Sequence, residues 1–477
     1  MSVPSRNVNR GAPSPAAAGG AQWPPSWNIQ PHGISVGRYI DPAFMRLEYE
    51  RLWSRAWQVA ARLDEIPEAG DYTTYEIGDQ SVVVVRVDAS TIKAYHNVCP
   101  HRGTALAQGS GRFASCRIMC PFHGWRWDLN GNNQFILERQ EFRGGQLRDS
   151  DVALRAVQVA LFAGFVFINF DPNCQPFDEF IAPVRALIEG LAIGDMHHYW
   201  WKSISIPANW KVAQEAFFEA FHVPATHPQL EKTGAEVIVG KREDAEFTHR
   251  YVNYEVFPHG HGRFYGGKKT PMAGHVNDRK GDPLEEMATR LMLLVDGMDA
   301  MVLREDVETL RTLRGKPIPE GSSLGGEYVK ALYATAAAQQ RPMPKLVPEI
   351  LNMWGGEIFV FPNLMILPQA GNAMIYRVRP NRTDPDSCTF EILSTRTLPA
   401  AVKPPRPRVE HVTDVNDPEQ VLLIPRQDLG NIPRIQKGLH SHGIQHTWLA
   451  SNQEKMIVNM HEELDRYLSM PLGAGAQ

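Results

Sequence analysis

Cysteine is scarce in this 477-residue chain, and the five cysteines that occur are widely separated. Five cysteines that lie so far apart cannot form a disulfide framework. Any pair at close spacing is therefore better explained as metal ligands. Long apolar runs are also missing, since none reaches the roughly 18 to 20 residues that a bilayer-spanning helix needs. The first residues lack the charged-then-apolar pattern of a signal peptide. We therefore expect a cytoplasmic protein that has no membrane association.

Basic charge is not in excess either. The chain has 49 lysines and arginines against 53 aspartates and glutamates, which gives a net charge of -4. This balance provides no positive field for a phosphate backbone, and we find no dedicated nucleic-acid motif, so no nucleic-acid partner is expected. No G-x-G-x-x-G motif follows a predicted strand. A nicotinamide cofactor is therefore expected to bind another protein.

The first part of the chain predicts a tail followed by a short helix. Residues 1–37 are rich in Pro, Gly, Ala and Ser and show no sustained periodicity, which predicts a disordered N-terminal tail. Residues 38–57 place apolar side chains at roughly helical spacing, with Asp41 able to cap a helix and Pro42 suited to its first position. We expect this helix to pack on the larger domain that comes later in the chain.

The rest of the sequence predicts two domains of different character. Residues 58–172 consist of short β-branched runs separated by turns, which predicts a small antiparallel β domain. Residues 173–477 alternate helical and strand patterns, with a helical insertion at about 281–340. The predicted fold class is therefore α+β, in which the larger domain has a central antiparallel sheet flanked by helices.

Two short Cys/His motifs, CPHRG and CPFHGW, lie in the predicted β domain. Their candidate metal ligands are Cys99, His101, Cys120 and His123. Two thiolates on one iron and two imidazoles on the other are the ligand set of a Rieske [2Fe-2S] cluster. A structural zinc site with two Cys and two His is the alternative. Zinc ligand pairs usually leave two or more residues between ligands, whereas Cys99 and His101 leave one, so the spacing favours the iron cluster.

A second candidate metal site lies in the stretch NWKVAQEAFFEAFHVPATHP. It predicts a helix around Trp210–Phe221, and Glu215, Glu219 and His222 stand at i, i+4 and i+7, which is one face of a helix. A proline then ends the helix, and the turned chain can bring His227 back to the same point. Two histidines and one carboxylate hold non-haem Fe(II) and leave positions open for dioxygen. The alternative is a helix with two structural histidines beside a proline turn.

The two Cys/His motifs resemble the Rieske loops of the ring-hydroxylating oxygenases, and the preceding EIPEAGDYTTYEIGDQSVVVVRV resembles the strands that open their Rieske domain. Respiratory-chain Rieske proteins carry an extra cysteine in each loop, joined as a disulfide, and here Thr104 and Phe122 stand at those positions. The resemblance implies a Rieske [2Fe-2S] domain over 58–172 and a catalytic domain with mononuclear Fe(II) over 173–477.

The second stretch is also similar to that family. The residues in step with the family pattern are Asn209, Trp210, Lys211, Glu215, His222 and His227. The resemblance implies that His222 and His227 are iron ligands, and it nominates Asp428, in RQDLGNIPRIQKGL, as the third ligand. Where the family has an aspartate three residues before the first histidine, this chain has Glu219. The resemblance implies that this carboxylate links His123 of one subunit to His222 of its neighbour as an electron path.

The resemblance implies the catalytic alpha subunit of an oxygenase. Such a subunit takes electrons from NAD(P)H through a separate reductase, with or without a ferredoxin, and uses dioxygen to hydroxylate an aromatic or polycyclic substrate. We expect a dioxygenase rather than a monooxygenase. One alternative is a Rieske monooxygenase that performs O- or N-demethylation. An alternative of another class is an electron-transfer protein that lacks the catalytic iron.

Assembly and the substrate pocket complete these expectations. The resemblance implies a head-to-tail homotrimer, possibly joined by a small β subunit. Four residues around the candidate iron site are expected to face the substrate, with core packing as the alternative: Ala216, Phe217, Ala220 and Val223. Four methionines between Met287 and Met301 are expected to pack in a core, with a lid over an apolar substrate as the alternative.

Overall fold

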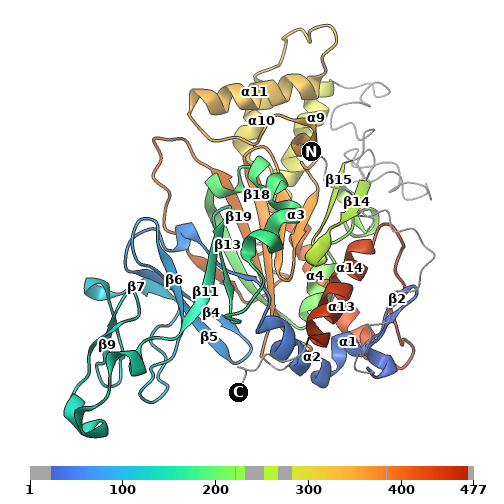
Figure 1. Cartoon of the computed structure of the whole chain (residues 1–477). Helices are drawn as coiled ribbons and strands as arrows, with labels where there is room; N and C mark the ends of the chain where they lie inside the picture. The colour runs from blue at the N-terminus through green and yellow to red at the C-terminus, as the bar shows by residue number, and fades with distance from the viewer. Residues whose placement is uncertain (1–22, 221, 231–251, 267–281, 383, 471–477) are drawn as a thin grey trace. The chain divides into compact units, whose positions relative to one another are not determined.

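The computed structural model describes residues 23–220, 222–230, 252–266, 282–382 and 384–470. The chain divides into two compact units, and many of its helices and strands are labelled in Figure 1. The smaller unit is Tyr49–Phe180, and the larger unit combines Met1–Glu48 with Ile181–Gln477. No helix in the described part of the chain is long and apolar enough to cross a membrane.

The smaller unit is an all-antiparallel β structure. Its main sheet has the order β3-β12-β11-β6-β5-β4-β7, and a three-stranded sheet has the order β10-β9-β8. The strands are β3 (Gln58–Arg62), β4 (Asp71–Ile77), β5 (Gln80–Arg86), β6 (Ile92–His96), β7 (Ser110–Arg112), β8 (Arg117–Met119), β9 (Arg126–Asp128), β10 (Asn133–Phe135), β11 (Ala156–Phe162) and β12 (Phe165–Asn169). One Cys/His motif follows β6, and the other joins β8 to β9.

The larger unit is built on an eight-stranded sheet with the order β14-β15-β16-β17-β18-β19-β13-β20. Its pairs are antiparallel except for β13 with β20, which is parallel. The strands are β13 (Met196–Ile206), β14 (Val252–Val256), β15 (Gly262–Gly266), β16 (Glu357–Val360), β17 (Leu364–Pro368), β18 (Asn372–Pro380), β19 (Cys388–Thr397) and β20 (Val409–Val412), and a separate pair is β1 (Ile29–Gln30) with β2 (Gly33–Ile34). The predicted α+β fold class is confirmed.

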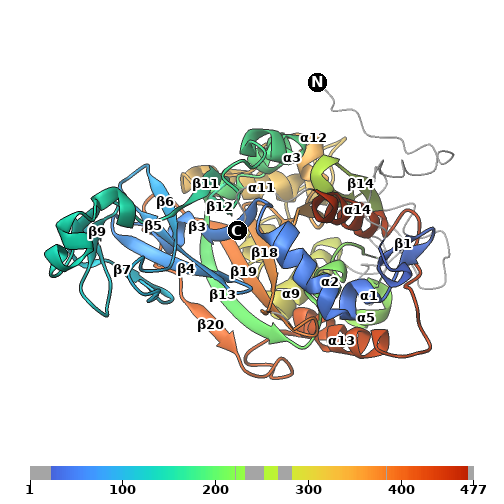
Figure 2. The ribbon, with the colours of Figure 1, turned by 60° about the horizontal axis from the view of Figure 1, so that its bottom comes forward.

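Helices flank this sheet. They are α1 (Gly37–Ile40), α2 (Pro42–Glu48), α3 (Phe177–Gly190), α4 (Trp210–Glu215), α5 (Val223–Thr226), α6 (Pro228–Leu230), α9 (Pro283–Met298), α10 (Arg304–Arg311), α11 (Leu324–Ala338), α12 (Pro348–Leu351), α13 (Leu423–Leu439) and α14 (Lys455–Ser469). The predicted helical insertion contains α9, α10 and α11, in which α10 contacts both α9 and α11. Figure 2 shows α1 and α2 beside α13, and α4 contacts β18, β19 and α13. These contacts place α4, which leads into the histidine motif, between the sheet and α13.

The predicted N-terminal tail is wrong in its second half, and residues 1–22 lie outside the described residues. Residues from Pro25 onward form a short turn and then the β1–β2 pair. Ile34 is fully buried. Its backbone N–H donates to Thr447 Oγ1 at 3.1 Å, and its carbonyl accepts from the Thr447 N–H at 2.9 Å. A partner more than 400 residues away therefore fixes a segment whose composition predicts disorder.

The helix predicted over 38–57 is broken into shorter pieces. Asp41 Oδ1 accepts from the Ala43 N–H at 2.8 Å and Pro42 is the first helical residue of α2, as the sequence predicts. The helix gives way to a π-helical turn at Tyr49–Trp53, and from Gln58 the chain is already strand β3. The last predicted residues, 54–57, form a turn that leads into β3, which pairs with β12.

Candidate metal centres and substrate cavity

The two Cys/His loops bring their four candidate ligands to the tips of adjacent turns. Cys99 and Cys120 are buried, and their side chains hydrogen-bond each other. The imidazole rings of His101 and His123 lie 4.7 Å apart between centroids. The His101 ring stacks on Trp125, and its Nδ1 is buried without a hydrogen-bond partner among the described residues. A nitrogen left free in this way suits a metal ligand.

The backbone of each loop is shaped to surround a bound group. Gly103 and Gly124 have φ values of +80° and +69°, and each N–H donates to the carbonyl of the cysteine that opens its loop, at 2.9 and 3.1 Å. Only glycine adopts such angles without strain. Burial raises the pKa of the Cys120 thiol, but backbone N–H groups and the Thr104 hydroxyl outweigh burial and lower it. The donor set of two thiols and two imidazoles therefore fits a Rieske cluster.

Residues His222, His227 and Asp428 form the second candidate centre. One potential ligand atom from each lies within 4.8 Å of the others. The Nε2 atoms of His222 and His227 lie 3.7 and 2.9 Å from Asp428 Oδ1. The His227 and Asp428 side chains are 3% and 9% exposed, whereas that of His222 is 24% exposed. The structure thus brings together three residues that span more than 200 positions in sequence.

Hydrogen bonds at Nδ1 orient both imidazoles. His222 Nδ1 lies 2.6 Å from Glu219 Oε1, and His227 Nδ1 lies 2.9 Å from Gln427 Oε1. With the proton on Nδ1, each ring presents the lone pair of Nε2 toward Asp428. Burial lowers the pKa of His222, but the Glu219 carboxylate outweighs burial and raises it. Two nitrogens and one carboxylate oxygen match the donor set of a non-haem Fe(II) site.

Two family models match the chain. Residues 56–141 match the Rieske [2Fe-2S] domain, and residues 193–314 and 316–470 match the ring hydroxylating alpha subunit (catalytic domain). The chain is a ring-hydroxylating alpha subunit of the Rieske oxygenases. Domains of these two kinds use a [2Fe-2S] cluster and a mononuclear iron, and such alpha subunits work with a reductase, a substrate and dioxygen.

Similar curated proteins are named as monooxygenases. The glycine betaine monooxygenase oxygenase subunit of Chromohalobacter salexigens is 32% identical over 204 residues, 42% of this chain and 44% of that protein. The carnitine monooxygenase oxygenase subunit of Escherichia coli K12 is 34% identical over 193 residues, 40% of this chain and 50% of that protein. The matches therefore span about half the length of these relatives.

Solved structures of two kinds share the fold of this Rieske alpha subunit. The quaternary ammonium Rieske monooxygenase CntA in complex with L-carnitine aligns with a TM-score of 0.59 at 17% identity, covering 91% of this chain and 95% of that one. Naphthalene 1,2-dioxygenase from Rhodococcus sp. bound to indole aligns with a TM-score of 0.61 at 18% identity, covering 91% and 94%. At these identities the likeness shows the fold alone.

The helix predicted over Trp210–Phe221 ends at Glu215, so that prediction is wrong. The Phe217 and Phe218 N–H groups bond to carbonyls three residues back, and the Ala220 N–H donates to Tyr254 Oη at 3.2 Å. Tyr254 thus replaces the helical acceptor. Glu219 consequently reaches His222 through a turn, where its Oε2 also accepts from the His222 N–H at 2.9 Å.

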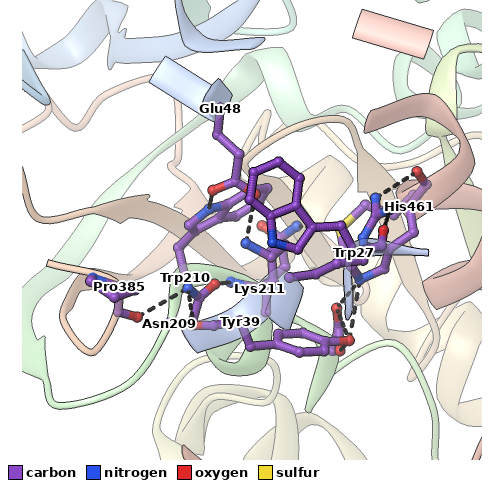
Figure 3. A network of polar contacts seen from close by, with 12 residues as sticks. Trp27, Tyr39, Glu48, Asn209, Trp210, Lys211, Pro385 and His461 are labelled. Carbon is purple, nitrogen blue, oxygen red and sulfur yellow. Dashed lines mark hydrogen bonds and ion pairs between the residues drawn. The ribbon is translucent and has the colours of Figure 1, made fainter. Parts of the chain in front are cut away.

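A buried polar network holds α4 of this Rieske alpha subunit in place (Figure 3). Asn209 caps the helix by accepting from the Lys211 N–H at 3.1 Å, and it donates to the Tyr39 carbonyl at 2.7 Å. Glu48 accepts from Trp210 Nε1 at 3.0 Å and from Lys211 Nζ at 2.6 Å, and both members of this ion pair are fully buried. The Asn-Trp-Lys motif therefore joins α4 to α1 and α2.

The same network continues to Glu215 and α14. Tyr39 Oη donates to Glu215 Oε2 at 2.9 Å, and His461 Nε2 lies 2.8 Å from Glu215 Oε1. Arg38 Nε donates to His461 Nδ1 at 2.9 Å, so the His461 proton lies on Nε2 and points to Glu215. Burial raises the pKa of Glu215 to about 8 and lowers that of His461 well below its usual range.

A cavity of about 510 Å³ opens beside the candidate iron ligands. Of the predicted substrate-facing residues, Phe217, Ala220 and Val223 line it, and Ala216 does not. Ala216 is the C-cap residue at which α4 ends. The expectation that the methionines pack in a core holds for Met298 and Met301, which are buried, and Met287 packs against a core cluster. All three also line this cavity, from α9 and the turn after it.

Sequence reasoning missed several residues that orient or surround the iron site. Gln427 is held by Gln229, since each amide bonds the other, at 2.7 and 3.2 Å. Glu48 and Tyr254 likewise act through contacts distant in sequence. Of the missed residues named here, Glu357 alone stands out in the sequence itself, because it is an acidic residue at the start of the otherwise apolar strand EIFV.

Proposed function

We propose that this alpha subunit is a monooxygenase that removes a methyl group from a heteroatom of its substrate, with nitrogen the favoured heteroatom. The observation that carries the proposal is that His222, His227 and Asp428 all line the cavity of about 510 Å³, so a substrate held there would lie next to a metal bound by these residues. The named activities of the similar glycine betaine and carnitine enzymes support demethylation over the aromatic dioxygenation expected from the sequence.

Each metal group would be held by the residues that the geometry brings together. The cluster ligands in this proposal are Cys99, His101, Cys120 and His123, and the mononuclear iron ligands are His222, His227 and Asp428. A non-haem iron bound here supplies dioxygen activation, with electrons that arrive singly through the cluster. The cavity residues bind the substrate and exclude water, while Glu219 and Gln427 hold the imidazole protons on Nδ1.

The reaction balances with one dioxygen per methyl group. Dioxygen, two electrons and two protons convert an N-methyl group into an N-hydroxymethyl group and one water. The C–N bond of that product then breaks, which releases formaldehyde and the amine with one methyl group fewer. For a quaternary ammonium the same step also releases a proton. NAD(P)H supplies the two electrons through the reductase.

Glu219 also carries a proposed role between subunits. Its carboxylate already bonds His222 through both oxygens, and we propose that it receives a hydrogen bond from His123 of a neighbouring copy. A homotrimer would supply that copy. The trimer, a β subunit, a ferredoxin and a cytoplasmic location stay predictions. Glu219→Gln should retain both metal centres and slow reoxidation of the cluster by dioxygen in the presence of substrate, as followed by stopped-flow absorbance.

Aromatic hydroxylation is the second candidate, because Phe217, Phe264 and Trp354 are among the cavity-lining side chains. A single-turnover experiment separates the two. The reduced holoenzyme is mixed with dioxygen and either benzyltrimethylammonium or naphthalene, and the products are identified by mass spectrometry. We expect formaldehyde and benzyldimethylamine in equal amounts from the first. A cis-dihydrodiol from naphthalene, with no formaldehyde from the ammonium compound, would replace our proposal with the dioxygenase.

A further inference from the structure

Glu357, the first residue of β16, is a buried acid that the proposed chemistry does not use. Its side chain lines the cavity and is fully buried, at 0% exposure. Neither carboxyl oxygen has a hydrogen-bond partner within the part of the chain that the structure describes. Buried carboxyl groups without partners are rare in proteins, because losing water without a replacement contact is unfavourable. A ligand that contacts the Glu357 carboxyl group would offset this unfavourable loss of water.

The other acids that line the cavity are already engaged. Glu219 bonds His222, and Asp428 lies 2.9 Å from His227 Nε2. Asp306 accepts from the Leu303 N–H at 2.9 Å and from Asn372 Nδ2 at 3.0 Å. These contacts give each carboxylate a structural or metal-binding role. Glu357 differs from them, since neither of its carboxyl oxygens has such a partner among the described residues.

The surroundings of Glu357 favour a cation. The register of the sheet sets it opposite Phe264, and its charge acts on Tyr376, so aromatic rings border the same region of the cavity. Burial and the nearby Glu219 raise the pKa of Glu357 well above its usual range. A positively charged ligand would reverse this effect, because opposite charges attract strongly where water is excluded and aromatic faces also attract cations.

Arg290 is the basic side chain that lines the same cavity. It lies on α9 and is paired with Glu286 at 3.9 Å. No ion pair joins Arg290 to Glu357 among the contacts of the described residues. A ligand cation would therefore meet at Glu357 a carboxyl that no described residue of the chain compensates. An anionic head group would instead meet Glu357, Glu219 and Asp428 and be repelled.

We propose that Glu357 binds the positively charged nitrogen of the substrate, a quaternary or tertiary ammonium that carries a bulky apolar group. This inference rests on the demethylase function proposed above and names its substrate class. Glu219 influences Glu357 and also bonds His222, so the methyl groups of a nitrogen held at Glu357 would lie toward the iron ligands. A cavity of about 510 Å³ has room beyond the head group, and Met287, Leu291 and Leu332 offer apolar contacts for the remainder.

Equilibrium dialysis of the holoenzyme against two isosteric probes tests this assignment. Benzyltrimethylammonium and neopentylbenzene differ only in the exchange of a charged nitrogen for carbon. We expect the wild type to bind the ammonium compound at least about tenfold more tightly than neopentylbenzene. One partly desolvated charge contact and the aromatic faces together are enough to give a difference in affinity of this size. Glu357→Gln should abolish this preference while binding neopentylbenzene as before. Equal preference in the wild type and in Glu357→Gln overturns the proposal.

A matched control variant and a second measurement test whether Glu357→Gln acts on cation binding directly. Glu410→Gln removes the same charge from an exposed side chain on β20 and should keep the wild-type preference. Thermal unfolding checks that Glu357→Gln is folded. Because a neutral Glu357 must ionise to meet the cation, calorimetry in two buffers of different ionisation enthalpy should show proton release on binding benzyltrimethylammonium. That release should be absent in Glu357→Gln, and its persistence there would contradict the assignment.

The outcomes separate this inference from the proposed function. Loss of cation preference in Glu357→Gln, with no formaldehyde from the wild type, would support the binding site and reject demethylation. Formaldehyde formation by the wild type, with a preference for the ammonium compound that Glu357→Gln leaves unchanged, would support demethylation and reject the binding site. Acetophenone serves as a neutral carbonyl probe. Tighter binding of acetophenone than of the ammonium compound, lost in Glu357→Gln, would show a protonated carboxyl that donates to a carbonyl and would overturn the cationic substrate.

Discussion

The two candidate metal centres of this chain are built by opposite strategies. The Cys99–His101 and Cys120–His123 pairs lie in two tight loops, and backbone groups of those same loops bond the cysteines. His222, His227 and Asp428 instead come from separate segments and are oriented by side chains such as Glu219 and Gln427. Local backbone geometry thus forms the first centre, whereas packing of the larger unit forms the second.

Removal of one ligand from each centre has the largest expected effect. His222→Ala should lower bound iron by one atom per chain and turnover to background, with the visible spectrum of the cluster unchanged. Cys120→Ser should abolish that spectrum and leave the mononuclear iron bound. Iron, acid-labile sulfide and absorbance of anaerobically purified proteins measure both. Loss of both centres in either variant would show that the two do not form independently.

The packing that supports the iron centre is tested by Glu48→Ala. This change leaves Lys211 buried without its partner, so the free energy of unfolding should fall by about 3–5 kcal/mol. Urea denaturation followed by fluorescence measures the loss. The matched control is Glu410→Ala, which removes the 68% exposed partner of Lys202 and should change stability by less than about 1 kcal/mol. Similar effects of the two changes would show that the buried pair has no special role.

A pH dependence should arise from Glu215 in the larger unit. Its pKa is about 8 in the folded chain against an ordinary value of 4.5, so the folded state holds this proton more tightly. The stability that results is fully present below pH 4.5 and is lost as pH rises through about 8. Glu215→Gln should therefore flatten the decline in the free energy of unfolding across that window. An unchanged decline in the variant would assign it to other groups.

A smaller effect is expected where a side chain orients a ligand without touching the metal. Gln427→Leu removes the acceptor of the His227 Nδ1 proton, and iron affinity should fall by roughly 10- to 100-fold. Competition with a chelator measures the affinity. Gln229→Leu should have a weaker effect, because Gln229 reaches His227 only through Gln427. An equal or larger loss in Gln229→Leu would contradict this order.

The smallest effect is expected at the cluster. Thr104→Val removes a hydroxyl that hydrogen-bonds Cys120, and hydrogen bonds to cluster sulfurs favour the reduced state. If the bond contributes about 1 kcal/mol, the one-electron reduction potential should fall by roughly 40 mV. Redox titration of the visible spectrum measures the shift. A potential unchanged or raised by the substitution would show that backbone groups alone set it.

The sequence predicts the local parts of this molecule well. The cluster loops need only residue types, spacing and two glycines, and all of these can be read from the chain. Asp428 could also be nominated, because its surroundings resemble a family pattern. The fold class follows from the alternation of strand and helix patterns. Each of these predictions depends on residues close together in sequence or on a resemblance that covers them.

Contacts between distant residues explain the failures. The predicted helix ends at Glu215, and beyond it the Ala220 N–H bonds Tyr254, a residue from a distant strand, instead of a helical carbonyl. Thr447 fixes a segment near Ile34 whose composition favours disorder. Glu48 and Gln427 have roles that appear only when the fold sets them beside Lys211 and His227. Such partners have no local signal in a single sequence.

The attachment of residues near Ile34 and Arg38 to residues near Thr447 and His461 has a consequence during synthesis. The smaller unit is a continuous segment, so its cluster loops can fold while translation continues. The larger unit is interrupted by it, and its early residues must wait for α14 before their partners exist. A ribosome therefore completes the candidate cluster site long before the candidate iron site, and we predict that truncation before α14 yields a brown protein without the mononuclear iron.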